Sequence, residues 1–72
     1  MMNFSDIMIG QRVRYKGSCA IGPCVGVVLK LYPPDEECPG AVRMKPDTLP
    51  EKWPYTDSVV FAPWVDDLES VA

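Results

Sequence analysis

Charged and less polar residues alternate along residues 10–16, where basic side chains separate Gln11, Val13 and Tyr15. Alternation with a period of two is typical of a half-buried antiparallel strand, because successive side chains point to opposite faces. The pattern therefore predicts a first strand that turns these three residues inward. Gly17 ends the strand, since glycine favours a turn.

The second run, residues 25–32, is the most apolar part of the chain. We expect a strand whose inward row comprises Val25, Val27, Leu29 and Leu31. Gly26 lies inside this strand, where a glycine indicates a bend or the close approach of another backbone. Residues 41–45 predict a third strand, with Val42 and Met44 turned inward.

Shorter elements follow. Residues 58–62 predict a fourth strand and residues 67–71 a fifth. Residues 63–65 favour one 3-10 turn before the last strand, because proline is tolerated at the start of a helical turn. Five short strands separated by proline and glycine turns predict an all-β fold. A five-stranded barrel suits a small core, because closure removes exposed strand edges.

A length of 72 residues with 47% hydrophobic positions allows one folded domain and argues against a disordered chain. We place a lead-in at residues 1–8 and the domain at residues 9–72. Eight prolines and five glycines disfavour long helices, and no apolar stretch is long enough to cross a membrane. The first residues also lack the pattern of a signal peptide. We therefore expect no membrane partner.

The cysteines are Cys19, Cys24 and Cys38. An odd number favours a reducing compartment over a disulfide framework, so we expect reduced thiols and a cytoplasmic location. Their spacing does not match the paired Cys-x-x-Cys turns that aim two thiolates at one zinc ion. We therefore expect no bound metal.

Catalysis has few candidate groups in this chain. Histidine, the usual proton shuttle near neutral pH, is absent. Carboxylates occur together at residues 35–37 and at Asp66 and Asp67, but adjacent carboxylates on loops are usually solvated. The chain also lacks a glycine-rich loop that would hold a phosphate. We expect neither enzyme activity nor a cofactor.

Basic residues are concentrated in the first half, although the net charge is -3. Such asymmetry indicates either a solvated strand face or a patch for an acidic partner. The candidate basic patch comprises Arg12, Arg14, Lys16, Arg43 and Lys45. Nucleic acid is the less favoured partner, because affinity for phosphates requires a basic surface and the whole chain has the opposite sign.

Aromatic residues supply the candidate partner-binding site. Trp53 and Tyr55 lie in a proline-containing loop, residues 48–57, where they either contact a partner or fold over the barrel as a lid. Tyr15 extends the same aromatic surface. We expect this loop to lie near residues 17–23, and loops on a rigid scaffold tend to carry recognition. Trp64 is expected in the core.

The order of these elements resembles an SH3-like barrel. Residues 10–15, a glycine followed by alternating apolar residues, resemble the first strand of such domains. Gly26, Val27 and Val28 are similar to the second strand of KOW-type barrels. Residues 59–64, followed by Leu68 and Glu69, resemble the closing strand, 3-10 turn and strand. The resemblance covers residues 9–71 and implies the fold more strongly than the function.

The type II dihydrofolate reductases, small SH3-like barrels that form tetramers around a central pore, are the most similar family. Residues 10–14 and Lys16 look like their first strand. Their closing segment is matched by Ser58, Val59, Pro63, Leu68 and Glu69. However, their active strand reads Val-Gln-Ile-Tyr, whereas Val59 is followed here by Val60, Phe61 and Ala62. The glutamine and tyrosine that hold nicotinamide and folate are therefore missing, and Tyr15 stands where the family has its pore lysine.

The resemblance implies the architecture of these reductases without their activity, and an origin on a bacterial mobile element such as an integron cassette. We expect a non-catalytic interaction module that binds a protein, a peptide or a second copy of itself. Val60 and Ala62 form the candidate oligomer face, because the reductases bury such strand surfaces between subunits. A KOW-like nucleic-acid-binding barrel is the alternative, and a relative of the type II reductases is the second alternative.

Overall fold

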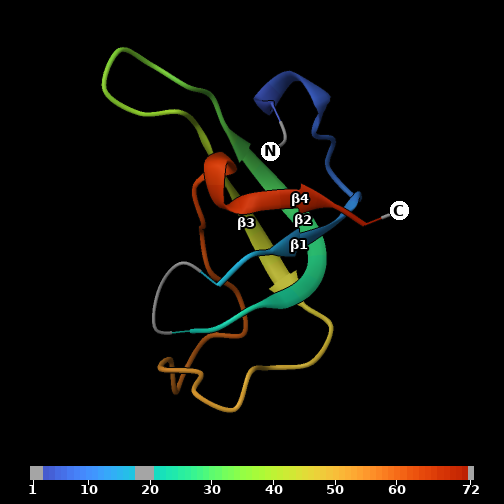
Figure 1. The fold of residues 1–72 in the computed structure, drawn as a ribbon. Helices are drawn as coiled ribbons and strands as arrows, with labels where there is room; N and C mark the ends of the chain where they lie inside the picture. Colours follow the sequence, from blue (N-terminus) through green and yellow to red (C-terminus); the bar gives the residue numbers. More distant parts are fainter. Residues whose placement is uncertain (1–2, 18–20, 72) are drawn as a thin grey trace.

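Four strands form one antiparallel sheet in the spatial order β3-β2-β1-β4, in a computed structural model that describes residues 3–17 and 21–71 (Figure 1). The strands are β1 Arg12–Tyr15, β2 Cys24–Tyr32, β3 Ala41–Pro46 and β4 Leu68–Ser70. Two 3-10 helices, η1 Phe4–Asp6 and η2 Val65–Asp67, precede β1 and β4. The described residues contain no α-helix, and none of their helices is long and apolar enough to span a membrane. The fold is therefore mostly β, as the sequence pattern predicts.

The alternation in the first strand is confirmed for Val13 and Tyr15, whereas Gln11 lies before β1 and outside the core. β1 turns Val13 and Tyr15 into the core and leaves Arg12 and Arg14 exposed on the opposite face. The strand lies at the middle of the sheet, between β2 and β4, so both of its edges are paired. This central position explains why its inward residues are almost completely buried.

A tight turn leads into β1. The Gln11 amide donates a hydrogen bond to the carbonyl of Met8 (3.1 Å), and Gly10 lies between them with a φ of +90°. Glycine adopts this conformation without the steric cost that a Cβ atom brings. The Gly10 amide also donates to the carbonyl of Val28 in β2 (2.8 Å), which joins the turn to the sheet.

The inward face of β2 differs from the predicted one. Three members of the expected inward row do not face the core: Val25, Val27 and Leu29. Val28 is fully buried instead. The pairing with β3 shifts between Val28 and Lys30, which makes Leu29 the extra residue of a β-bulge. The bulge reverses the alternation, so that Leu31 packs against the core as expected.

Gly26 marks a close approach between two backbones, one of the two possibilities that its position inside a strand indicates. A Cβ atom at this position would lie 2.3 Å from the carbonyl oxygen of Lys45 and 2.8 Å from its carbonyl carbon. No side chain fits at that distance, so glycine is the residue that lets β2 and β3 meet here.

The expected fourth strand, residues 58–62, is not a regular strand. Two isolated bridges join this part of the chain to β3: Met44 with Phe61, and Ala41 with Trp64. Pro63 lies between them. Its carbonyl accepts a hydrogen bond from the Val42 amide, but proline has no N–H to return one, so the ladder is interrupted. The sheet therefore has four strands and is not closed, and a five-stranded barrel is not confirmed.

η2 carries the chain from the outer edge of β3 to the outer edge of β1. It begins at Val65, two residues after the predicted start of the 3-10 turn at Pro63. β4 then pairs antiparallel with β1, with Arg14 opposite Glu69 and Tyr15 opposite Leu68. The three residues of η2 thus separate the segment bridged to β3 from the strand paired with β1.

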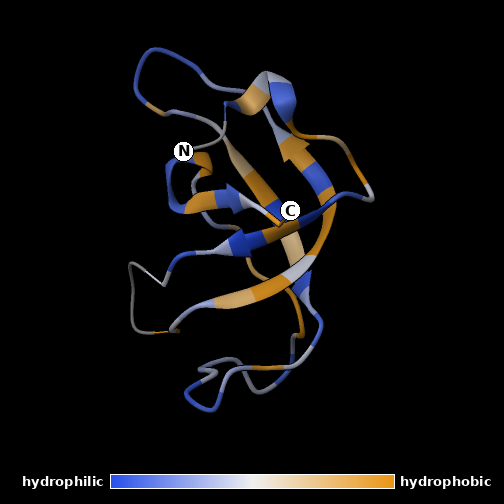
Figure 2. Ribbon diagram, turned by 45° about the vertical axis from the view of Figure 1, so that its right-hand side comes forward, coloured by the Kyte–Doolittle hydropathy of each residue, from blue (hydrophilic) through white to orange (hydrophobic). Residues whose placement is uncertain are grey.

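One hydrophobic core lies against the inner face of the sheet. Val42 and Met44 of β3 are fully buried, as predicted. The buried apolar residues are Ile7, Val13, Tyr15, Ile21, Val28, Val42, Met44, Phe61, Val65 and Leu68. Hydrophilic residues dominate the loop between β2 and β3, whereas most of β2 is hydrophobic (Figure 2).

Candidate functional site

A series of aromatic rings runs from the core to the surface. The ring of Tyr15 meets that of Phe61 with 5.1 Å between centroids, and Phe61 meets Trp53 at 5.4 Å. Trp53 in turn meets Tyr55 at 5.1 Å. All three pairs are edge to face, an arrangement that the charge distribution of aromatic rings favours. The series links the buried end of β1 to the loop that follows β3.

Trp53 acts as a lid of the core. Its indole Nε1–H donates a hydrogen bond to the carbonyl of Ser58 (2.9 Å), and its amide donates to the carbonyl of Pro50 (3.0 Å). The side chain is partly buried and packs against the core through Phe61. Of the two sequence interpretations, this geometry favours the lid for Trp53.

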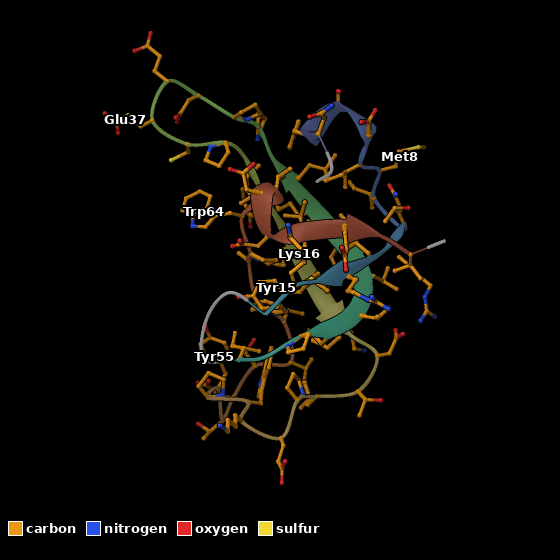
Figure 3. The ribbon with its side chains drawn as sticks, in the orientation of Figure 1. Met8, Tyr15, Lys16, Glu37, Tyr55 and Trp64 are labelled. Carbon is orange, nitrogen blue, oxygen red and sulfur yellow. The ribbon has the colours of Figure 1, made fainter. Side chains whose placement is uncertain are left out.

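Tyr55 has the opposite character. Its side chain is 45% exposed, and Figure 3 shows it at the periphery of the fold. The ring of Trp53 supports that of Tyr55 through an edge contact, and a little under half of Tyr55 stays accessible to solvent. Leu49 and Val59 are the other large hydrophobic residues that are exposed in residues 47–60. Tyr55 is therefore the predicted contact residue that remains available to a partner.

Tyr15 cannot extend this surface. It is only 2% exposed, because β1 turns it into the core against Phe61. The expectation for Trp64 is also wrong, since this residue is 49% exposed instead of buried. Trp64 bridges to Ala41 at the edge of β3, and its side chain projects away from the sheet (Figure 3).

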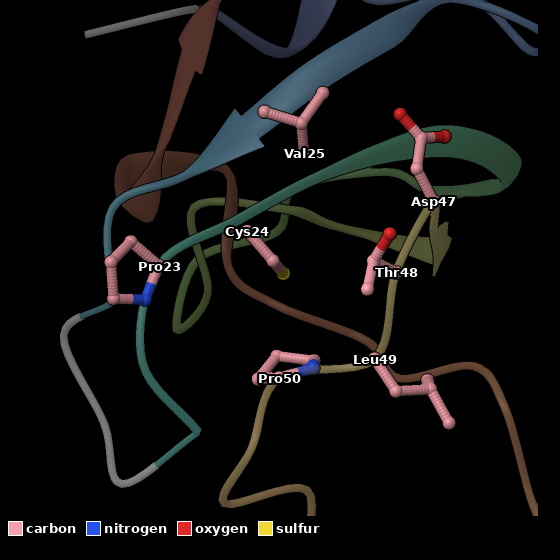
Figure 4. Close-up of a pocket in the computed structure, with 7 residues that line it drawn as sticks. All are labelled: Pro23, Cys24, Val25, Asp47, Thr48, Leu49 and Pro50. Atoms are coloured by element: carbon pink, nitrogen blue, oxygen red, sulfur yellow. The ribbon is translucent and has the colours of Figure 1, made fainter.

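An open pocket of about 300 Å³ lies where the start of β2 meets the loop after β3 (Figure 4). The Asp47 amide donates to the carbonyl of Val25 (2.9 Å) and holds the two segments together. The pocket is lined by Pro23, Cys24, Val25, Asp47, Thr48, Leu49 and Pro50. The predicted proximity of the two loops is thus confirmed for Pro23 and residues 48–50.

Cys24 contributes its thiol to this pocket. It is half-buried, and this burial raises the pKa of the thiol because a thiolate there loses solvation. Cys24 and Cys38 are both free thiols, and Cys19 lies outside the described residues. Within residues 3–17 and 21–71, no three cysteine or carboxylate side chains come together in a way that could hold a metal ion.

The candidate basic patch is divided by ion pairs. Arg12 pairs with Asp47, and Arg14 pairs with Glu69 at 3.4 Å. Asp47 follows β3 and Glu69 lies in β4, so the acidic partners come from segments distant in sequence. These two arginines are therefore already neutralised by neighbouring carboxylates.

The other three patch residues have no acidic partner among the described residues: Lys16, Arg43 and Lys45. Arg43 and Lys45 share the outer face of β3, where both are exposed. Arg43 stands opposite Lys30 of β2, which sequence reasoning did not assign to the patch. The predicted inward row of β2 already turns Lys30 outward, and the sheet register places it beside the basic residues of β3.

The candidate oligomer residues have unequal exposure. Ala62 is exposed, whereas Val60 is partly buried and its amide donates a hydrogen bond to the hydroxyl of Ser58 (3.3 Å).

Comparison with known proteins adds no assignment: no protein-family model, no curated protein and no solved structure matches the chain.

Proposed function

We propose that this protein is a non-catalytic interaction module that binds a peptide segment of a partner protein. The observation that carries the proposal is the different exposure of two neighbouring aromatic residues. Trp53 is anchored to Ser58 and Phe61, whereas the ring of Tyr55 rests on Trp53 and is 45% exposed. A tyrosine held rigidly at a surface loses little entropy on contact, which is why this residue type is frequent at interfaces.

The proposed partner lies across residues 47–60. Leu49 and Val59 add exposed apolar area along this segment, and the pocket at Leu49 and Pro50 accommodates one side chain. An extended peptide meets these requirements, because its alternate side chains can occupy a pocket and contact a flat ring.

The architecture that we propose is an SH3-like barrel with an incomplete fifth strand. Residues 61–64 bridge to β3, and β4 pairs with β1 at the other edge of the sheet after the single turn of η2. This arrangement supports a sheet that curls toward closure. We further propose a cytoplasmic location, supported by the odd number of cysteines, and a bacterial mobile-element origin, supported by the resemblance to the type II reductases.

Selection from a random peptide library displayed on phage tests this function. We expect selected peptides to bind the wild-type chain and to bind Tyr55→Ala with an affinity that is lower by about tenfold or more. Truncation of a central interface aromatic often costs about 2 kcal/mol of binding free energy. Tyr55→Phe keeps the ring and is the matched control. Peptides that bind Tyr55→Ala as tightly as wild type would overturn the proposal.

Self-association is a second candidate, favoured by the exposure of Ala62 beside the outer edge of β3. A dimer or tetramer through Val60 and Ala62 gives a mass above 8.0 kDa by light scattering at micromolar concentration. Ala62→Arg then returns the mass to that of the monomer. A species of 8.0 kDa alone in the wild-type protein contradicts this arrangement.

The reductase alternative has its own test. At the positions where the type II reductases carry glutamine and tyrosine, this chain has Val60 and Ala62. Neither side chain can hold nicotinamide or folate by hydrogen bonds. We therefore expect no oxidation of reduced nicotinamide cofactor in the presence of dihydrofolate, measured by absorbance. Turnover by the purified chain would establish the reductase instead.

A further inference from the structure

The outer face of β2 and β3 carries a row of side chains that the function proposed above does not use. The sheet register places Tyr32 of β2 opposite Ala41 of β3, and Ala41 bridges to Trp64. Directly paired residues in a sheet project from the same face. Tyr32, Ala41 and Trp64 therefore form one row across three adjacent segments, with the small alanine at its centre.

This face lies opposite the core. Val42 and Met44, which alternate with the outer residues of β3, are fully buried on the other side. Trp64 is 49% exposed, and Figure 3 shows it pointing away from the sheet. An exposed tryptophan at a sheet edge is unusual unless it contacts something, because burial of its large ring is favourable.

One strand separates the two aromatic residues of the row. Neighbouring strands lie about 4.8 Å apart, so the backbones of Tyr32 and Trp64 are about 10 Å apart with a methyl group between them. The two aromatic residues therefore stand on either side of the small Ala41 side chain. A planar ring can stack on either of them.

Positive charge accompanies the two rings. Arg43 stands opposite Lys30 in the row next to Ala41, and Lys45 follows on the same face of β3. The Lys30 Nζ atom lies 5.3 Å from the centroid of the Tyr32 ring. In the described part of the chain none of these three cations has a carboxylate partner, in contrast to Arg12 and Arg14. This face is therefore free to receive an anion.

Flat rings joined by negative charges are the defining chemistry of a nucleic acid, and unpaired bases are needed for stacking on side chains. We propose that this outer face binds single-stranded nucleic acid, with bases stacked on Trp64 and Tyr32 and phosphates held by Lys30, Arg43 and Lys45. The contacts are with ring faces and phosphates, so binding is tolerant of sequence.

An acidic loop borders the face and limits its affinity. Residues 33–40 connect Tyr32 to Ala41, and the Asp35 carboxylate accepts hydrogen bonds from the amides of Glu37 and Cys38 (2.8 and 2.9 Å). Glu36 and Glu37 remain exposed, and Figure 3 shows Glu37 at the tip of this loop. Asp66 adds a further exposed carboxylate after Trp64. Such charges repel phosphates, so their removal strengthens binding in this arrangement.

Fluorescence anisotropy with labelled oligonucleotides of about 15 nucleotides, oligo-dT and oligo-rU, tests the proposal at about 50 mM salt. We expect Trp64→Ala to weaken binding about tenfold, and Trp64→Phe, which keeps a stacking ring, to retain most of it. Arg43→Gln is expected to lower the salt dependence of binding by about one released ion. The double variant Glu36→Gln with Glu37→Gln is expected to bind more tightly than wild type.

Lys52→Gln is the matched control, because Lys52 is an exposed cation in the loop after β3 and lies outside this face. Circular dichroism confirms that each variant is folded. Equal losses for Lys52→Gln and Arg43→Gln, or a folded Trp64→Ala that binds as wild type, overturn the proposal. Poly-glutamate that competes as well as the oligonucleotide also overturns it, because the face then recognises acidic polypeptide without base stacking.

Discussion

The indole of Trp53 meets the phenyl ring of Phe61 edge to face, with 5.4 Å between the ring centroids. Phe61 is buried, and its ring also meets that of Tyr15. The loop after β3 is therefore tied to the core through aromatic packing. Trp53 and Tyr55 are close in sequence, but their roles differ. Trp53 packs against the core and supports the loop, whereas the ring of Tyr55 is exposed.

Replacement of Trp53 by alanine is expected to lower the free energy of unfolding by about 3 kcal/mol, because the variant loses ring packing and the hydrogen bond to Ser58. Tyr55→Ala is expected to cost less than about 1 kcal/mol, since Tyr55 is 45% exposed and lies outside the core. Urea denaturation measures both. Equal destabilisation by the two substitutions contradicts the division of roles.

Gly26→Ala is expected to destabilise the fold by about 2 kcal/mol or more, because the new methyl group meets the carbonyl of Lys45 at 2.3 Å. Gly10→Ala is a useful comparison. A Cβ atom there meets nothing within 4 Å, but the φ of +90° costs about 1 kcal/mol for a residue with a side chain. The midpoint of thermal denaturation should therefore be lower for Gly26→Ala than for Gly10→Ala. The reverse order argues against the close approach between β2 and β3.

The Arg14–Glu69 pair is expected to contribute little to stability. Its two side chains are 56% and 41% exposed, and exposed ion pairs are typically worth less than about 1 kcal/mol. A double-mutant cycle with Arg14→Gln and Glu69→Gln measures the coupling free energy. Salt at about 1 M should remove most of it by screening. A coupling that is larger and insensitive to salt contradicts the exposed position of this pair.

Cys24 is expected to react slowly with thiol reagents until the pH exceeds the usual pKa of a cysteine, because burial raises its pKa and the thiolate is the reactive form. The folded chain holds this proton more tightly than the unfolded chain. The stabilisation of the folded state that comes from this proton is therefore fully present below the pKa of the thiol in the unfolded chain. It is lost as the pH rises through the pKa of the thiol in the folded chain. A variant with Cys19→Ser and Cys38→Ser isolates the reaction, and unfolding in urea should restore ordinary reactivity.

Parts of the site were foreseeable from local pattern. The alternation of β1 correctly turns Val13 and Tyr15 inward, and the same pattern already argues against Tyr15 as a surface contact. The proximity of Pro23 to residues 48–50 follows from antiparallel connections. The exposure of Trp64 could not be predicted, because it depends on how residues 61–64 meet the edge of β3.

By itself the sequence determined the mostly β class and the inward residues Val13, Tyr15, Val42 and Met44. These follow from strict alternation, which one segment carries alone, whereas the need for glycine at position 26 arises from the carbonyl of Lys45 in the neighbouring strand. Only the tertiary structure decided the inward face of β2, because apolar residues occupy both alternating sets of positions in this strand. The β-bulge at Leu29 determines which set faces the core on each side of it. It also decided which cations are neutralised, because ion pairs such as Arg14–Glu69 join segments distant in the chain and depend on strand order.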